Sequence, residues 1–233
     1  MKKAFTMIEL LFVIVVIGIL SAMIIPNTQT ISPLHNAAIQ VASHLRYTQH
    51  LAMIDDTYDR NRIDTDGNVI WFKDRWQLVF SSSEYSDYKP AYTIFSDRQG
   101  NAKERGDANE KEIAKNPENI QQIMTGGYGS AQAINYGHSN FKGMKKLNIG
   151  NSYGVTSVRL IGGCSGSRIA FDHLGRPMKG DHNSVTSPYN MSSTYSASKQ
   201  RLITSNCKIE LKAEDKIVNI IIRPETGYTT IEY

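Results

Sequence analysis

The chain has few cysteines and little excess charge. Only Cys164 and Cys207 occur among 233 residues, so at most one disulfide can form within the chain, and only in an oxidising compartment. The formal net charge is +4, of which Lys2 and Lys3 supply two. The remainder is nearly balanced and gives little electrostatic reason to expect nucleic-acid binding. A mean hydropathy of −0.36 argues against a polytopic membrane protein.

Recognisable catalytic motifs are also missing. No Walker loop, zinc-peptidase helix or nucleophile elbow occurs in the sequence. The pairs Asp172–His173 and Asp181–His182 are chain neighbours, which face opposite sides of a strand. The acidic residues Asp55, Asp56 and Asp59 and the segment 64–68 lack EF-hand spacing, so a solvated turn is favoured over calcium. We therefore predict a protein that is not an enzyme and has no cofactor and no metal site.

One long apolar run stands out at the N-terminus. No charged residue occurs from Leu10 to Ile25, and the 21 residues from Phe5 to Ile25 precede Pro26. As a helix they would extend about 31 Å, which matches a hydrocarbon core of about 30 Å. Lys2 and Lys3 before the run place the N-terminus in the cytoplasm and the rest of the chain across the membrane.

A single carboxylate, Glu9, interrupts the start of this run. A secretory signal, a plain membrane anchor and a buried core helix all leave Glu9 unexplained, because such a charge costs about 3 kcal/mol in a bilayer. The segment Leu20-Ser21-Ala22 is also a poor signal-peptidase site. The signal and anchor interpretations nevertheless remain alternatives on pattern alone.

The segment Lys3-Ala4-Phe5-Thr6-Met7-Ile8-Glu9-Leu10-Leu11 resembles the prepilin processing and N-methylation motif of type IV pilins and type II secretion pseudopilins. The resemblance implies a leader over residues 1–4 and a prepilin peptidase that cuts between Ala4 and Phe5 and methylates Phe5. It also implies a transmembrane assembly helix over 5–26 with a kink at Pro26. The residue before the cut is usually Gly in this family, and Ala4 is small enough for us to expect processing.

The resemblance also assigns a role to Glu9. Its charge needs a cation in the bilayer, and the amine of Phe5 in a neighbouring subunit is a natural one. Such a pair would set the axial register of subunits, because a wrong register leaves a buried charge unpaired. The implied partners are the peptidase, other pilin or pseudopilin subunits, an inner-membrane assembly platform and the lipid bilayer.

Residues 27–55 are predicted to form an amphipathic stalk helix. Leu34, Ala37, Ala38, Val41, Leu45 and Ala52 fall near helical spacing on one face. We expect this stalk to continue the first helix beyond the bend at the prolines and to pack on the head. His35, His44 and His50 do not share a face at ligand spacing, so no metal site is supported.

Residues 56–233 are predicted to form an extracytoplasmic β-rich head. Short β-prone runs occur at 69–72, 76–80, 92–95, 155–161, 168–171, 208–211, 217–222 and 228–231. Asp66-Gly67 is a hairpin candidate, and 97–119 and 179–199 read as surface loops. Strands after one long helix predict an α+β, pilin-like fold in which that helix packs on an antiparallel sheet.

The head resembles the GspH/FimT family of pseudopilins and minor pilins through weaker motifs. These are Arg46 and Ala52 in the stalk, Ile94–Asp97 with Gly100 and Glu112, the segment 169–176, and the closing segment 220–228. The resemblance implies a minor subunit with a periplasmic head on an inner-membrane helix. Such a subunit would assemble into a type II secretion pseudopilus or a type IV pilus-like filament.

Two further interpretations concern the head. A minor pilin whose head binds DNA or a surface ligand is the alternative function, although residues 224–233 contain no Lys or Arg. Cys164 lies in a Gly-rich segment without an identifiable histidine base, so a disulfide with Cys207 is favoured over a nucleophile. Closing that loop would contribute about 4 kcal/mol of stability.

Overall fold

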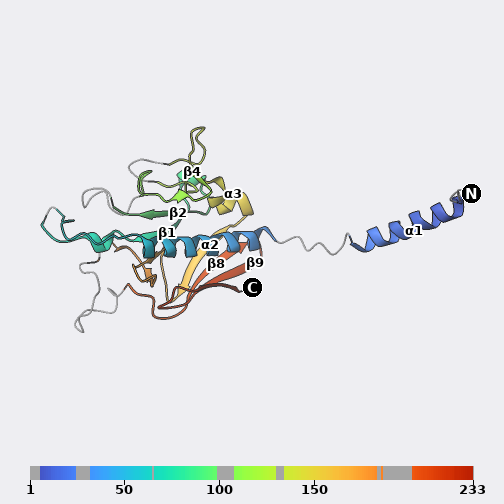
Figure 1. Ribbon diagram of the computed structural model, residues 1–233. Coiled ribbons are helices and arrows are strands. Elements are labelled where there is room, and N and C mark those ends of the chain that lie inside the picture. The colour runs from blue at the N-terminus through green and yellow to red at the C-terminus, as the bar shows by residue number, and fades with distance from the viewer. Residues whose placement is uncertain are drawn as a thin grey trace, which may run out of the picture. The chain divides into compact units, whose positions relative to one another are not determined.

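The computed structural model describes residues 6–24, 32–64, 66–98, 108–129, 134–182, 185 and 201–232. The chain divides into two compact units, residues 1–32 and residues 33–233. The first unit contains the helix α1 (Met7–Ile24), and the second contains a helix, the sheets and the remaining short elements (Figure 1). The predicted bend at Pro26 lies outside the described residues.

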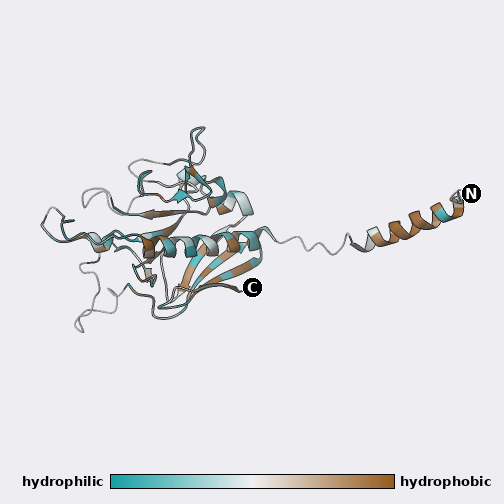
Figure 2. Ribbon diagram, in the orientation of Figure 1, coloured by the Kyte–Doolittle hydropathy of each residue, from teal (hydrophilic) through white to brown (hydrophobic). Residues whose placement is uncertain are grey.

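Helix α1 consists mostly of apolar residues, drawn brown in Figure 2, and Glu9 is its only charged residue. Its large apolar side chains between Met7 and Leu20 are all exposed, from 37% at Val16 to 90% at Met7. Within the described residues no helix combines the length and the apolar character that a membrane crossing requires. The transmembrane segment over 5–26 therefore stays a prediction.

Helix α2 (Pro33–Ile54) begins at a proline, a residue whose fixed φ suits the first helical turn. All six apolar residues of the predicted stalk face are buried, and Ala42 and Thr48 extend that buried face. The small side chains Ala37, Ala38 and Ala42 are at most 1% exposed, so they let neighbouring strands approach the helix closely. The predicted stalk, residues 27–55, corresponds to this helix where the structure describes it.

Two four-stranded antiparallel sheets pack against α2. The first sheet has the order β2-β1-β6-β7, and the second has the order β10-β9-β8-β5. The bounds of the first are β1 Trp76–Ser81, β2 Ala91–Ser96, β6 Arg168–Phe171 and β7 Pro177–Lys179. Those of the second are β5 Ser157–Gly162, β8 Cys207–Ala213, β9 Lys216–Ile222 and β10 Thr229–Glu232. The α+β class and the antiparallel pairing are confirmed, and the strands form two larger sheets where one was expected.

Burial follows the strand period in the second sheet. Cys207, Ile209 and Leu211 of β8 are buried, and each is separated from the next by a more exposed residue. In β9, Val218, Ile220 and Ile222 are buried in the same alternation, although Ile221 is buried as well. The strand β2 is buried at every position.

A third group of elements covers the outer edge of β2, the strand at the end of the first sheet. It contains β3 (Lys115–Asn116), β4 (Asn119–Ile123) and α3 (Ile149–Tyr153). The Ile94 amide donates to the Met124 carbonyl at 3.0 Å, and the Ala114 amide donates to the Ile94 carbonyl at 2.9 Å. The prediction of a surface loop over 97–119 is therefore wrong for its described part, because Ala114 is 4% exposed.

The predicted strand over 69–72 is also wrong. Val69 forms only an isolated antiparallel bridge with Ile63, and a 3-10 helix spans Trp71–Lys73. The expected turn at Gly67 is present, with a left-handed φ of +81° at that residue. The Phe72 side chain is buried in the head although this residue belongs to the 3-10 helix and not to a strand.

Candidate assembly site

Glu9 lies in the first turn of α1 and takes part in a reciprocal cap with Thr6. The Glu9 carboxylate oxygen Oε2 accepts hydrogen bonds from the Thr6 amide at 3.1 Å and from the Thr6 hydroxyl at 2.9 Å. The Thr6 hydroxyl oxygen in turn accepts from the Glu9 amide at 3.4 Å. This is the capping box that a Thr followed three residues later by Glu forms at a helix start.

The cap gives Glu9 a local partner that the sequence analysis did not assign. The signal was present in the sequence as Thr6-Met7-Ile8-Glu9, the spacing of a capping box directly before an apolar run. Both side-chain bonds end on Oε2, and no described residue contacts Oε1. Within the described residues, the Thr6 bonds thus use one of the two carboxylate oxygens.

Three other predicted site residues cannot be placed. Ala4 and Phe5, the predicted cleavage and N-methylation residues, lie outside the described residues, as does Pro26. Of the residues assigned to the N-terminal site, the structure therefore positions Glu9. The processing assignments stay predictions.

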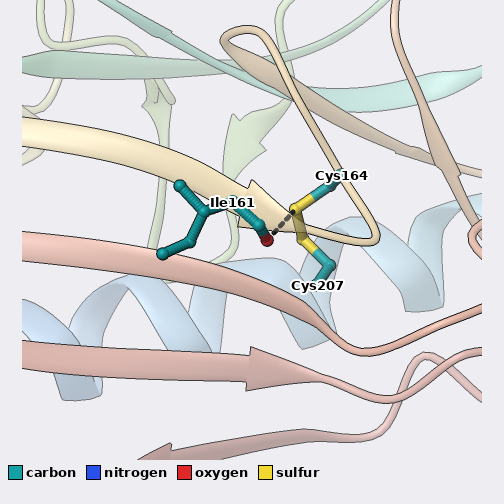
Figure 3. The surroundings of a disulfide bond; sticks show 3 residues. All are labelled: Ile161, Cys164 and Cys207. Carbon is teal, nitrogen blue, oxygen red and sulfur yellow. Dashed lines mark hydrogen bonds between the residues drawn. A yellow bond between two sulfur atoms is a disulfide. The ribbon is translucent and has the colours of Figure 1, made fainter.

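The two cysteines are joined by a disulfide at the edge of the second sheet (Figure 3). Cys164 follows β5 and Cys207 begins β8, and their Cα atoms are 5.0 Å apart. Both are buried, with exposed fractions of 3% and 0%. The Cys164 sulfur lies 3.4 Å from the carbonyl oxygen of Ile161. The bond therefore fixes the end of the edge strand β5 to its neighbour.

Two of the head motifs, the segments 169–176 and 220–228, meet on α2. The Gln49 side-chain amide donates to the Gly175 carbonyl and to the Thr226 carbonyl, both at 2.8 Å. One turn follows β6 and the other follows β9, so Gln49 ties the first sheet to the second. One helical turn before Gln49, the Arg46 guanidinium donates to the Thr229 carbonyl at 2.8 Å. We call Arg46 and Gln49 with these three carbonyls the α2 clasp.

Glycine is required in this clasp at position 227. Its φ is +66°, and a Cβ there would lie 2.6 Å from the Gln49 amide nitrogen and 2.9 Å from the Gly175 oxygen. A side chain would therefore strain the backbone and push the two turns apart. Packing of the two turns therefore explains the glycine in the segment 220–228 without any bound ligand.

A partly buried polar chain links α2 to the first sheet and to α3. The Tyr153 hydroxyl donates to Gln40 Oε1 at 2.7 Å, and Gln40 Nε2 donates to the Tyr92 hydroxyl at 2.8 Å. The Tyr92 hydroxyl lies 2.7 Å from His44 Nδ1, and it donates to that nitrogen when the neutral ring carries its proton on Nε2. Burial lowers the pKa of His44 to about 4 and raises the pKa of Tyr92 above its usual range. The chain is therefore uncharged at neutral pH.

The acid–imidazole neighbours do not form dyads. Asp172 is buried and its carboxylate accepts from the Arg176 guanidinium at 2.8 Å, while His173 is exposed in the adjoining turn. His182 is 3% exposed, and neither of its ring nitrogens has a hydrogen-bond partner. Burial, with Arg75 and the neighbouring arginines at 201 and 168, lowers the pKa of His182 to about 3.

The acidic residues considered for calcium have other partners. Asp55 pairs with Arg98 and accepts a bond from the Trp76 indole, and Asp64 accepts from the backbone amides of Asp66 and Asn68. Across the described ranges no group of three or more His, Cys, Asp or Glu side chains is placed to hold a metal ion.

Comparison with known proteins identifies the N-terminal segment. Residues 1–25 match the family model of the prokaryotic N-terminal methylation motif. No curated protein and no solved structure matches the chain. The motif supports a type IV pilin-like protein that is a substrate of prepilin peptidase and assembles with other pilin subunits. The resemblance of the head to the GspH/FimT family has no such support and stays a prediction.

Proposed function

We propose that the chain is a minor pseudopilin or pilin-like subunit with a structural role and no catalysis. Prepilin peptidase removes residues 1–4 and methylates Phe5. The helix that starts there anchors the subunit in the inner membrane and holds the head in the periplasm. An assembly platform then transfers the helix into a type II secretion pseudopilus or a type IV pilus-like filament.

The observation that carries this proposal is Glu9 at the start of an otherwise apolar helix, inside the matched motif. The exposed apolar surface of α1 is the kind of surface that is buried in lipid or against other helices. A filament core made of such helices excludes water as the bilayer does, so the unpaired charge would be costly in both places. An amine from a neighbouring subunit relieves that cost.

The first step is tested by intact-mass analysis of the full chain made with and without an active prepilin peptidase. We expect loss of residues 1–4 and the addition of one methyl group to Phe5 only when the peptidase is present. Ala4→Gly is the matched control, because it places the usual residue before the cut. Cleavage of Ala4→Gly with no cleavage of the natural chain would contradict the proposal.

A further inference from the structure

A pocket of about 340 Å³ opens at the end of α2 in the second unit. It is lined by Met53, Ile54, Asp55, Asp56, Thr57, Tyr58, Trp71 and His173. Three of these are large apolar or aromatic residues with high exposed fractions, namely 49% for Met53, 64% for Ile54 and 63% for Tyr58. Apolar side chains gathered around one pocket are typical of an interaction surface.

Beside this pocket, the guanidinium of Arg98 is bound by an aromatic ring and a carboxylate. The Arg98 guanidinium lies over the Trp76 ring, 5.8 Å from its centroid, and pairs with the Asp55 carboxylate. The Trp76 indole donates to that carboxylate at 2.6 Å. A positive charge here is held by an aromatic face and a carboxylate together.

The pocket is lined by two more aromatic rings and a further carboxylate. The rings of Tyr58 and Trp71 pack edge to face with centroids 5.1 Å apart. Asp56 accepts a bond from the Tyr58 amide at 3.1 Å but forms no ion pair with any described residue. Two aromatic rings and a carboxylate that line one pocket fit a lysine or arginine side chain.

Suitable cations lie toward the other end of the head. Lys145 and Lys146 begin the 3-10 helix before α3, are exposed, and form no ion pair within the described chain. The Lys146 carbonyl accepts from Gln40 Nε2 at 3.0 Å, which places this pair near the start of α2. From Gln40 to Ile54 the helix extends roughly 20 Å. Figure 1 shows α3 beside the N-terminal half of α2, away from the segment that follows the helix.

We propose that the pocket binds a lysine side chain from the Lys145–Lys146 pair of a second copy of this chain. The two surfaces are unlike and lie toward opposite ends of the head, so each bound copy leaves one of each free. A contact between unlike surfaces continues from subunit to subunit in a row. The inference rests on the proposed filament function and adds a contact between heads to the contact between helices.

The test is site-specific photo-cross-linking of the full chain in detergent micelles, with the cross-linking residue at Thr57, which lines the pocket. We expect cross-linked dimers in which the captured peptide contains Lys145 and Lys146. Lys145→Glu with Lys146→Glu in the partner copy should reduce that product roughly fivefold or more, as expected for an ion pair reinforced by aromatic contact. Asp56→Lys in the cross-linker copy should restore it.

Two variants serve as matched controls. Asp59→Lys changes an exposed acid outside the pocket, and Lys216→Glu changes an exposed lysine at the start of β9. Neither should alter the product. Capture of another peptide, or no change on charge reversal, would overturn the inference even if the natural chain enters filaments. Capture at Lys145–Lys146 by a chain that never enters filaments would support the inference and refute the proposed function.

Discussion

At the residue scale, Glu9 caps its own helix, and we propose that the same carboxylate also pairs with a cation of a neighbouring subunit. Its cap with Thr6 is worth about 1 kcal/mol. Placing a carboxylate in an apolar surrounding costs about 3 kcal/mol. The cap alone therefore does not offset the cost of the charge. A glutamine would form the same cap without that charge, so the retained carboxylate points to a second, cationic partner.

His44 makes the fold sensitive to acid. Its pKa is lowered to about 4 in the folded chain by burial, against about 6.5 when unfolded. The unfolded chain therefore binds more protons between these pH values, and stability falls as pH drops from about 6.5 toward 4. At pH 5 the loss is about 2 kcal/mol from this residue. His182, with a folded pKa of about 3, acts in the same direction.

Urea unfolding of the full chain in detergent at pH 7 and pH 5 measures this effect. His44→Gln should reduce the difference between the two pH values by about 2 kcal/mol. His50→Gln, at an exposed position on the same helix, should leave the difference unchanged. An equal pH dependence in His44→Gln and the natural chain would show that His44 is not buried neutral.

At the element scale, the disulfide ties the edge strand β5 to β8. Closing a loop across 43 residues is worth about 4 kcal/mol in the loop-entropy model. Cys164→Ser with Cys207→Ser should lower the free energy of unfolding by about that amount under non-reducing conditions. The unreduced natural chain should weigh less than its reduced form by the two thiol hydrogens. Free thiols in periplasmic material would contradict the pairing.

The α2 clasp joins two sheets through one side chain. Gln49→Ala removes two hydrogen bonds of about 1 kcal/mol each, so we expect a loss of about 1–2 kcal/mol in the free energy of unfolding. Ser43→Ala, at an exposed position of α2, is the control and should change little. Urea unfolding gives both values. A Gln49→Ala chain as stable as the control would show that the clasp contributes nothing.

The sequence predicts the parts of this fold that follow a period. Trp76–Phe80, Arg168–Phe171 and Ile217–Ile222 are strands because β-branched and aromatic residues dominate them, and the buried face of α2 follows the helical period. Asn119–Ile123 carries no such signal, since its sequence is mostly polar. It pairs with the short strand β3, and Ile123 also forms an isolated bridge with Gly143. The division of strands between two sheets depends on long-range pairing, which no local pattern contains.

Part of the candidate site can be predicted from the sequence as well. Glu9 stands out because a charge in an apolar run is rare, whereas the Thr6 cap was recognisable only from its three-residue spacing. The α2 clasp could not be predicted. Gln49 lies 126 residues from Gly175 and 177 from Thr226, and only the folded chain brings these groups together.

At the scale of the whole molecule, the two units differ in the surface they offer. The unit over 1–32 contains a helix that is apolar on every side, whereas the unit over 33–233 has its own core around α2 and a disulfide. A helix with this surface needs an apolar partner, whereas the head is folded around a core of its own. This difference between the two units fits a subunit that assembles through its helix.

Incorporation of full-length Glu9 variants into sheared filaments tests the central claim most directly. Glu9→Gln keeps the capping box and removes the charge, Thr6→Ala removes the cap and keeps the charge, and Glu9→Leu removes both. All three should insert in the membrane and be processed. We predict that Thr6→Ala enters filaments and that Glu9→Gln and Glu9→Leu do not. Normal incorporation of Glu9→Gln would contradict the account, because the charge would then have no role in assembly.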